Sequence, residues 1–142
     1  MIRMIGLDLD GTLLTMDKRL TDENRNTLEE AARRGILIVP VTGRPLNGIP
    51  RNIADLPFIR YAVTSNGAKV TDRQTGRTIR ERCMTAETAE KVLTAAEGEG
   101  IIREYFTEGY GFHDPKTGKL LWKRFKGTPI LKYLEQSRKD NR

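Results

Sequence analysis

The chain contains one cysteine and one histidine in 142 residues. Cys83 has no partner for an internal disulfide bond, and a zinc site would lack its usual ligands. Both observations favour a reducing, cytoplasmic setting. No stretch of about 18 consecutive apolar residues occurs, so no membrane span is expected. The acidic residues Asp8 and Asp10 come too early for a secretory signal peptide.

Charge of one sign is concentrated only at the end of the chain, where Lys116–Arg142 is clearly basic. The net charge is +6, from 25 Lys and Arg against 19 Asp and Glu, which favours anionic ligands such as phosphate esters. Most basic residues are interleaved with acids, so nucleic acid is not expected as a partner. Trp122 and Phe125 lie among lysines and could stack on bases, but a strand with a solvated basic face is the favoured interpretation.

The composition predicts a folded globular chain. Hydrophobic residues make up 37% and charged residues 31%, with only six prolines, which is unlike a disordered segment. A length of 142 residues suits one domain, or one domain and part of another.

The first half of the chain alternates between strand and helix patterns. Three apolar stretches are typical of buried strands: Met1–Leu9, Ile36–Val41 and Tyr61–Thr64. Between them, Thr21 is a helix N-cap, Gly35 ends that helix, and Pro45 can open a second, shorter helix. A βαβαβ order predicts an α/β fold, a Rossmann-like parallel sheet with flanking helices.

The second half has a different pattern. A hairpin is expected from Lys69–Asp72 and Thr78–Arg82, followed by a boundary near residues 82–85. The later elements expected are a helix at Ala86–Glu97, strands at Ile101–Thr107 and Tyr110–His113, a turn at Asp114–Gly118, and a helix at Pro129–Gln136.

Two carboxylates follow the first predicted strand in the segment Asp8-Leu9-Asp10-Gly11-Thr12. Successive strand residues face opposite sides, so Asp8 and Asp10 are expected on one face and Leu9 on the other. Such a pair can divide the work of phosphoryl transfer if a metal holds one ionised and the surroundings keep the other protonated. Asp8 would then attack phosphorus, and Asp10 would protonate the leaving oxygen. Mg²⁺ would offset the combined negative charge.

The next two strand ends carry further small polar groups. Thr42 can donate its hydroxyl to a phosphate oxygen, and the amide of Gly43 provides another anion contact. Ser65-Asn66-Gly67-Ala68 is a turn in which Asn-Gly supplies positive φ angles. Because the carboxyl ends of parallel strands meet at one edge of a sheet, the polar residues that follow all three predicted strands are expected near the ligand.

Three motifs together resemble those of a known family. DLDGTLL at Asp8–Leu14, VTGRP at Val41–Pro45 and SNGA at Ser65–Ala68 are similar, in order and spacing, to motifs of the Cof-like, subclass IIB haloacid dehalogenase hydrolases. The resemblance covers residues 1 to 115. It implies that residues 1–82 form the N-terminal part of a hydrolase core. Residues 83–142 would form a partial α/β cap and a C-terminal tail.

The resemblance also assigns roles to individual residues. It implies that Asp8 is the nucleophile and a metal ligand. Asp10 would be the acid/base residue and would bind the metal through its backbone carbonyl. The remaining residues would bind the phosphoryl group or lie near the substrate: Thr42, Gly43, Arg44, Asn66 and Gly67.

The sequence departs from the family after the cap begins. The phosphate-binding lysine and the GDxxND-type motif found later in family members are not identifiable, and no Gly-Asp dipeptide occurs. In the family, the strand that bears the last motif pairs with the first strand. We therefore expect an incomplete form with weak or no activity alone, and association through the exposed edge of Met1–Leu9.

The leading hypothesis is Mg²⁺-dependent hydrolysis of a small phosphorylated metabolite, such as a sugar phosphate, through an aspartyl phosphate. A phosphomannomutase-like phosphotransferase is an alternative within the same chemistry. A catalytically inactive binding remnant of the same fold is another, because fold alone does not determine function.

Overall fold

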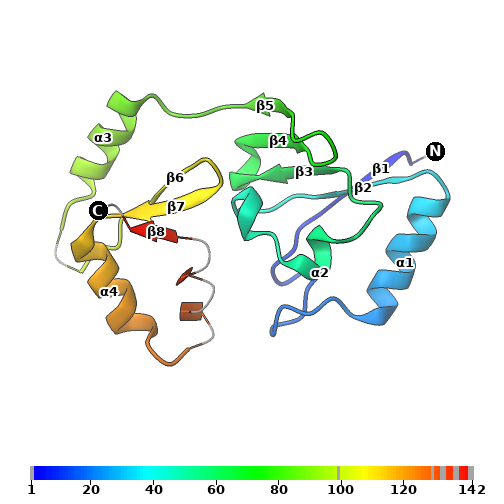
Figure 1. The fold of residues 1–142 in the computed structure, drawn as a ribbon, viewed down its shortest axis with the longest axis horizontal. Coiled ribbons are helices and arrows are strands. Elements are labelled where there is room, and N and C mark those ends of the chain that lie inside the picture. Colours follow the sequence, from blue (N-terminus) through cyan, green and yellow to red (C-terminus); the bar gives the residue numbers. More distant parts are fainter. Residues whose placement is uncertain (1, 99, 129, 132–133, 136–137, 141–142) are drawn as a thin grey trace. The chain divides into compact units, whose positions relative to one another are not determined.

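A computed structural model describes residues 2–98, 100–128, 130–131, 134–135 and 138–140. The chain forms two compact units, Met1–Arg82 and Cys83–Arg142 (Figure 1). Each unit is described by itself below.

The first unit begins with a parallel pair of strands. Strand β1 (Met4–Leu7) pairs with strand β2 (Leu37–Pro40), in a register that sets Met4 opposite Leu37. The proline stands at the last position of β2, where the lack of an amide hydrogen interrupts the sheet least. The two strands are shorter than the apolar stretches that predict them.

Helix α1 (Asp22–Arg33) connects these strands. The Thr21 side chain accepts a hydrogen bond from the Asn24 amide, 3.2 Å away, and so caps the first turn. Gly35 follows the helix with φ of +79°, and its amide donates to the Ala32 carbonyl at 2.9 Å. The predicted start and end of this helix are confirmed.

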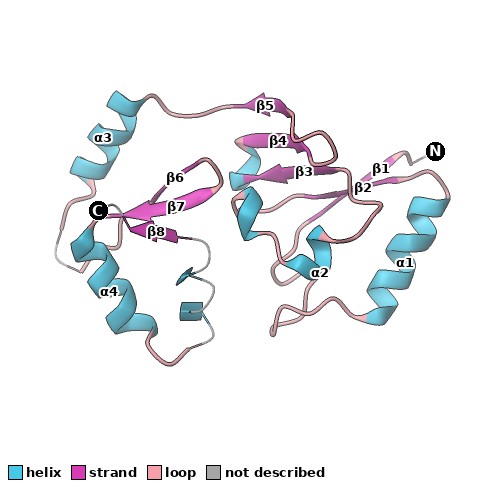
Figure 2. Ribbon diagram, viewed as in Figure 1, coloured by secondary structure: helices cyan, strands magenta, loops and turns pink. Residues whose placement is uncertain are grey.

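The parallel sheet continues into strand β3 (Tyr61–Thr64) through one bridge. Val41 and Val63 pair in parallel, and the Thr42 amide donates to the Val63 carbonyl at 3.0 Å. The order β1-β2-β3 with helices between the strands confirms the predicted α/β architecture (Figure 2). The chain between β2 and β3 holds a 3-10 turn, Leu46–Gly48, and the short helix α2 (Arg51–Ala54).

The predicted hairpin is present beside β3. Strand β4 (Lys69–Asp72) pairs antiparallel with β3 and with strand β5 (Thr78–Glu81), and a bulge lies between Val70 and Thr71. The sheet is therefore mixed rather than wholly parallel.

One apolar core holds the first unit together. Its members come from the loop after β1, from α1, β2 and β3, and from the α2 region: Leu9, Leu13, Leu14, Leu28, Ile38, Ile49, Ile53, Leu56, Ile59 and Ala62. Burial of such side chains stabilises a fold by about 1.5–3 kcal/mol each. The loop that carries the two aspartates is thus anchored in the core by the buried side chains of Leu9, Leu13 and Leu14.

The second unit contains two long helices and a small sheet. Helix α3 (Ala86–Ala95) is followed by strands β6 (Tyr105–Thr107) and β7 (Tyr110–His113), which pair antiparallel, and β8 (Arg138–Asp140) runs parallel to β7. Tyr105 and Phe112 stack across β6 and β7, with ring centroids 5.4 Å apart.

Two expectations for this unit are wrong. Residues 114–118 are not an isolated turn, and Trp122 does not lie on a strand, because both segments belong to helix α4 (Pro115–Phe125). Asp114 caps this helix and Pro115 occupies its first turn, where no amide hydrogen is needed. The predicted helix at 129–136 lies largely outside the described residues.

In the part of the chain that the structure describes, none of the helices combines the length and apolar character needed to cross a lipid bilayer.

Candidate active site

The loop after β1 directs its two carboxylates outward. Leu9 is fully buried, whereas Asp8 and Asp10 on either side of it are exposed. The Leu13 amide donates to the Asp8 carbonyl at 3.2 Å, and Gly11 supplies a φ of +83° for the tight turn. The alternation expected from a strand end therefore extends through this loop.

The two carboxylates have different neighbours. Asp8 accepts a hydrogen bond from the Thr12 hydroxyl, with 3.1 Å between Oδ2 and Oγ1. Within the described residues, this neutral hydroxyl is the only side chain that binds the Asp8 carboxylate. The nucleophile candidate thus keeps most of its lone pairs available for a cation or a ligand.

Asp10 is held by two cations. Arg44 forms a bidentate pair with it, with Nε 2.6 Å from Oδ2 and Nη2 2.9 Å from Oδ1. The Lys18 ammonium lies 2.8 Å from Oδ1. We call Lys18, Asp10 and Arg44 the Asp10 clamp. A bidentate arginine–carboxylate pair is among the strongest side-chain interactions in proteins.

The clamp lowers the pKa of Asp10. The hydrogen bond from Arg44 is the main cause that holds the pKa of the Asp10 carboxyl well below its usual range. Partial burial acts in the opposite direction, and the hydrogen bond from Lys18 adds to the lowering. The neighbours of Asp10 in the structure therefore favour its ionised form, in contrast to the expectation that the surroundings keep this carboxyl protonated.

Arg44 is fixed in place by its own backbone and by the next turn. Its amide donates to the Thr42 hydroxyl at 3.2 Å, and its Nη1 donates to the Gly48 carbonyl at 2.9 Å. The side chain is only 13% exposed. Contacts thus run from Asp10 through Arg44 to Thr42, across the ends of β1 and β2.

The turns after β2 and β3 are also joined to each other. The Asn66 amide donates to the Thr42 carbonyl at 3.2 Å, and the Ser65 amide donates to the Arg44 carbonyl at 3.0 Å. Asn66 has φ of 55° and Gly67 has φ of 90°, as an Asn-Gly turn predicts. Backbone hydrogen bonds thus join the turn after β2 to the turn after β3.

Sequence reasoning missed Lys18, Thr12 and Asn52. Thr12 binds the Asp8 carboxylate, and Asn52 Nδ2 donates to the Lys18 carbonyl at 3.1 Å. The hydrogen bond between Asn52 and Lys18 joins α2 to the β1–α1 loop, so no local sequence pattern predicts it. Thr12 belongs to the first motif and could have been proposed from its spacing to Asp8.

The residues present accommodate a divalent cation only in part. Among the described residues, no three His, Cys, Asp or Glu side chains come together as a cation site. The Asp8 carboxylate and the Asp10 backbone carbonyl remain as oxygen donors, because the Asp10 carboxylate is occupied by Arg44 and Lys18. Mg²⁺ is commonly bound by one or two carboxylates together with ligand phosphate and water, so these donors suit it.

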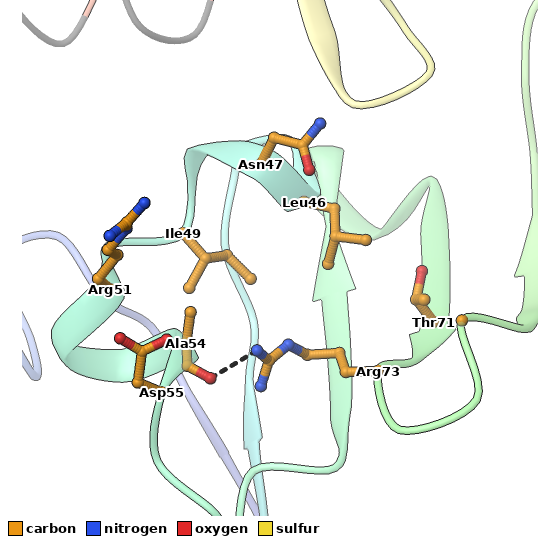
Figure 3. Close-up of a pocket in the computed structure, with 9 residues that line it drawn as sticks. Leu46, Asn47, Ile49, Arg51, Ala54, Asp55, Thr71 and Arg73 are labelled. Carbon is orange, nitrogen blue, oxygen red and sulfur yellow. Dashed lines mark hydrogen bonds between the residues drawn. The ribbon is translucent and has the colours of Figure 1, made fainter.

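A cavity of about 400 Å³ lies elsewhere in the first unit (Figure 3). Leu46 and Ile49 border it, and the Arg73 guanidinium in its wall donates to the Ala54 carbonyl at 2.6 Å. No residue of the Asp10 clamp lines it, and neither does Asp8. The 3-10 turn that contributes Leu46 and Asn47 to its lining also supplies the Gly48 carbonyl that binds Arg44.

Comparison with known proteins places this geometry in a family. The sequence profile of the haloacid dehalogenase-like hydrolases matches residues 5–141. The chain is 32% identical over 120 residues to the phosphatase YwpJ of Bacillus subtilis, which covers 84% of this chain and 41% of that protein. It is 33% identical over 93 residues to the HMP-PP phosphatase of Serratia proteamaculans, with 66% and 34% covered.

Solved structures give the same result for the fold. A haloacid dehalogenase-like hydrolase from Bacillus subtilis superposes with a TM-score of 0.74 at 28% identity, over 96% of this chain and 50% of that one. A subclass IIB sugar phosphatase superposes with a TM-score of 0.73 at 21% identity, over 94% and 49%. This chain thus spans about half the length of these structures, and less of the curated relatives. As its three motifs predict, the chain belongs to the haloacid dehalogenase-like hydrolase family.

Proposed function

We propose that this chain carries the phosphoryl-accepting part of a Mg²⁺-dependent phosphatase that hydrolyses small phosphorylated metabolites. The observation that supports it most directly is the loop after β1. There Asp8 is exposed and, among the residues that the structure describes, its carboxylate is bound only by a neutral hydroxyl, while Asp10 is linked to the Thr42 turn. Named relatives include an HMP-PP phosphatase and a 5-amino-6-(5-phospho-D-ribitylamino)uracil phosphatase, both of which act on phosphorylated metabolites.

In this proposal Asp8 is the nucleophile. A carboxylate oxygen of Asp8 forms a bond to phosphorus, and the bond between phosphorus and the ester oxygen breaks. Asp10 donates a proton to that leaving oxygen, and later accepts a proton from the water that hydrolyses the aspartyl phosphate. Arg44 and Lys18 lower the pKa of Asp10 and so favour the ionised form, which suits the second role. For the first role Asp10 must take up a proton before the ester bond breaks.

Thr42 and the turn residues would orient the phosphoryl group. The Thr42 side chain is buried to 4% exposure, which fixes its hydroxyl, and that hydroxyl already accepts a hydrogen bond from the Arg44 amide. It can therefore donate its own hydrogen to a phosphate oxygen. The Asn66 side chain lies against Gly43, where a Cβ atom would come within 2.8 Å of Asn66 Oδ1, so the Asn66 amide would meet an anion bound at the Thr42 turn.

Mg²⁺ is proposed as the cofactor, held by Asp8 and by the Asp10 backbone carbonyl. A bound cation would neutralise part of the charge that two carboxylates and a phosphate bring together.

The test compares hydrolysis of p-nitrophenyl phosphate by the wild-type chain and by Asp8→Asn, each with and without Mg²⁺. We expect release of p-nitrophenol that requires Mg²⁺ and is lost in Asp8→Asn. Asn keeps the size of the side chain and its bond with Thr12, so a lost rate reports chemistry rather than folding. Equal rates in the two proteins would remove Asp8 from the mechanism.

A non-catalytic anion-binding role is the second candidate, and the clamp is the observation that favours it. Both Asp10 oxygens are engaged, and no third acidic side chain joins the site among the described residues. Phosphate binding without turnover, in wild type and Asp8→Asn alike, would support this role.

Phosphotransfer to a second position of a sugar monophosphate would appear as an isomerised ester rather than free phosphate.

We also propose self-association through β1. Within the described part of the chain, β1 has β2 as its hydrogen-bonded neighbour on one side, and Ile2 and Met4 are 69% and 61% exposed. An unpaired apolar strand edge favours pairing with another strand. Met4→Lys is expected to lower the apparent mass in light scattering, and an unchanged mass would contradict the proposal.

A further inference from the structure

Lys18 is the one group of the clamp that the motifs do not explain. Its ammonium lies 2.8 Å from Asp10 Oδ1, and the side chain is 50% exposed. A lysine ammonium has three N–H donors, and among the described residues Asp10 is its only side-chain partner. The ammonium therefore has donors left for a ligand that arrives from solvent.

The backbone of the loop is built to hold Lys18 in this place. Lys18 has φ of 62°, a left-handed conformation that is uncommon for a residue with a long side chain. Its amide donates to the Thr15 carbonyl at 2.9 Å, and its own carbonyl accepts from Asn52 at 3.1 Å. Backbone strain that neighbouring hydrogen bonds sustain is concentrated at functional sites.

The position of Lys18 indicates which part of a ligand it would meet. In the proposed reaction Asp10 exchanges a proton with the leaving oxygen, so the leaving group must lie within hydrogen-bond distance of Asp10. Lys18 binds the Oδ1 atom of that same carboxylate. The ammonium is thus adjacent to the leaving group rather than to the phosphoryl group that Asp8 receives.

We propose that Lys18 is a specificity residue that selects phosphate esters and anhydrides whose leaving group carries its own negative charge. The anionic leaving group accepts a hydrogen bond from the Lys18 ammonium, while Arg44 keeps its bidentate pair with Asp10. This inference rests on the proposed function for the identity of the leaving-group side, and it names the substrate class of that site.

The competing explanation is an exposed ion pair that only fastens the loop. Such pairs contribute little to stability, and their loss would leave ligand binding unchanged. The two explanations differ in what a charge-removing substitution does to ligands with one or two anionic groups. Asn tolerates the left-handed conformation, so Lys18→Asn removes the ammonium while keeping the backbone.

The experiment uses the full chain with Asp8→Asn in every protein, so that the probe is not consumed. Isothermal titration calorimetry measures the affinity for inorganic pyrophosphate and for inorganic phosphate, at one fixed Mg²⁺ concentration in excess over the probe. Pyrophosphate places a second phosphate in the leaving-group position. Lys18→Arg keeps the charge, and Arg19→Gln removes a neighbouring charge that pairs with Asp17 instead.

We expect Lys18→Asn to weaken pyrophosphate binding by about tenfold, the size of one charge-assisted hydrogen bond. Phosphate binding should change by less than about twofold, and Lys18→Arg and Arg19→Gln should bind pyrophosphate nearly as the parent does. An unchanged pyrophosphate affinity in Lys18→Asn would overturn the inference, as would an equal loss for both anions or no binding of pyrophosphate by the parent.

A second variant and a separate measurement of turnover distinguish misfolding, and failure of the proposed function, from failure of this inference. Lys18→Gly also accepts a positive φ and serves if Lys18→Asn does not fold, which its circular dichroism would show. Failure of the proposed function is a separate result, because it is measured as Asp8-dependent turnover in the wild-type chain. The ratio of pyrophosphate affinity to phosphate affinity is measured in Asp8→Asn proteins and does not depend on turnover.

Discussion

Gly43 and Asn66 approach so closely that a Cβ atom on residue 43 would lie 2.8 Å from Asn66 Oδ1. The two residues follow different strands, β2 and β3, and the contact joins the second and third motifs. A side chain at residue 43 would therefore meet the Asn66 amide. The atom that a Cβ would meet is the end of an exposed side chain, so that side chain, rather than the backbone, would yield.

Gly43→Ala should therefore displace the Asn66 amide at small cost to stability. We expect the free energy of unfolding in urea to fall by about 1 kcal/mol or less, the lower end of the range for added volume. The loss of phosphate affinity should be larger than the loss of stability, because the new methyl group hinders a phosphate from reaching the backbone amide of residue 43. In an Asn66→Ala background the stability cost should vanish, and a cost that persists there would place the clash elsewhere.

The bidentate pair between Arg44 and Asp10 should be strongly coupled. Arg44 is mostly buried and its Nη1 is already committed to the Gly48 carbonyl, so little rearrangement is available when Asp10 is removed. A double-mutant cycle with Arg44→Met and Asp10→Asn should give a coupling energy of about 1–3 kcal/mol in urea unfolding. The same cycle on Glu30 and Arg34, an exposed helix pair, should give about 0.3–0.5 kcal/mol.

The sequence was sufficient where local chemistry decides the structure. The Thr21 cap and the Gly35 end of α1 depend on residues within four positions, and both were predicted. The outward direction of Asp8 and Asp10 followed from strand alternation. Each of these features is determined by near neighbours in the chain.

The sequence was insufficient where a distant contact decides. Gly118 suggested a turn, yet it lies inside α4, where a Cβ would come within 2.9 Å of the His113 ring. The glycine is explained by that contact rather than by a turn. Likewise, the strained Lys18 depends on Asn52, a contact 34 residues away. The lowered pKa of Asp10 depends on Arg44, which is equally distant in sequence.

Acid should weaken the first unit through Asp72. The Arg60 guanidinium donates to its Oδ2 at 2.9 Å and is the main cause that lowers the pKa of the Asp72 carboxyl. A pKa that is lower in the folded state than in the unfolded state stabilises the fold above the unfolded value. That contribution is lost as the pH falls below about 4, through the folded pKa.

Urea unfolding of wild type and Asp72→Asn between pH 6 and pH 3 checks this. The difference between the two proteins isolates Asp72 from other carboxyls, and it should shrink as the pH falls. Asn retains an acceptor for the Gln74 amide, so the loop after β4 stays closed. A difference that is constant over the whole range would show that the Arg60 contact contributes nothing to the acid response.

Asp114 should decide whether α4 forms, because it binds two elements of the second unit at once. Its Oδ1 accepts from the Thr117 amide at 2.8 Å, and its Oδ2 lies 3.0 Å from Arg103 Nη2. Asp114→Ala removes the cap and the ion pair together and should lower the free energy of unfolding by about 1–2 kcal/mol.

Asp114→Asn separates the two contributions, because Asn caps a helix as well as Asp does but carries no charge for Arg103. We expect it to recover most of the stability lost in Asp114→Ala, since the Arg103 contact lies partly in solvent, where ion pairs contribute little. Helix content from circular dichroism should follow the same order. If Asp114→Asn were as unstable as Asp114→Ala, the ion pair rather than the cap would determine the start of α4.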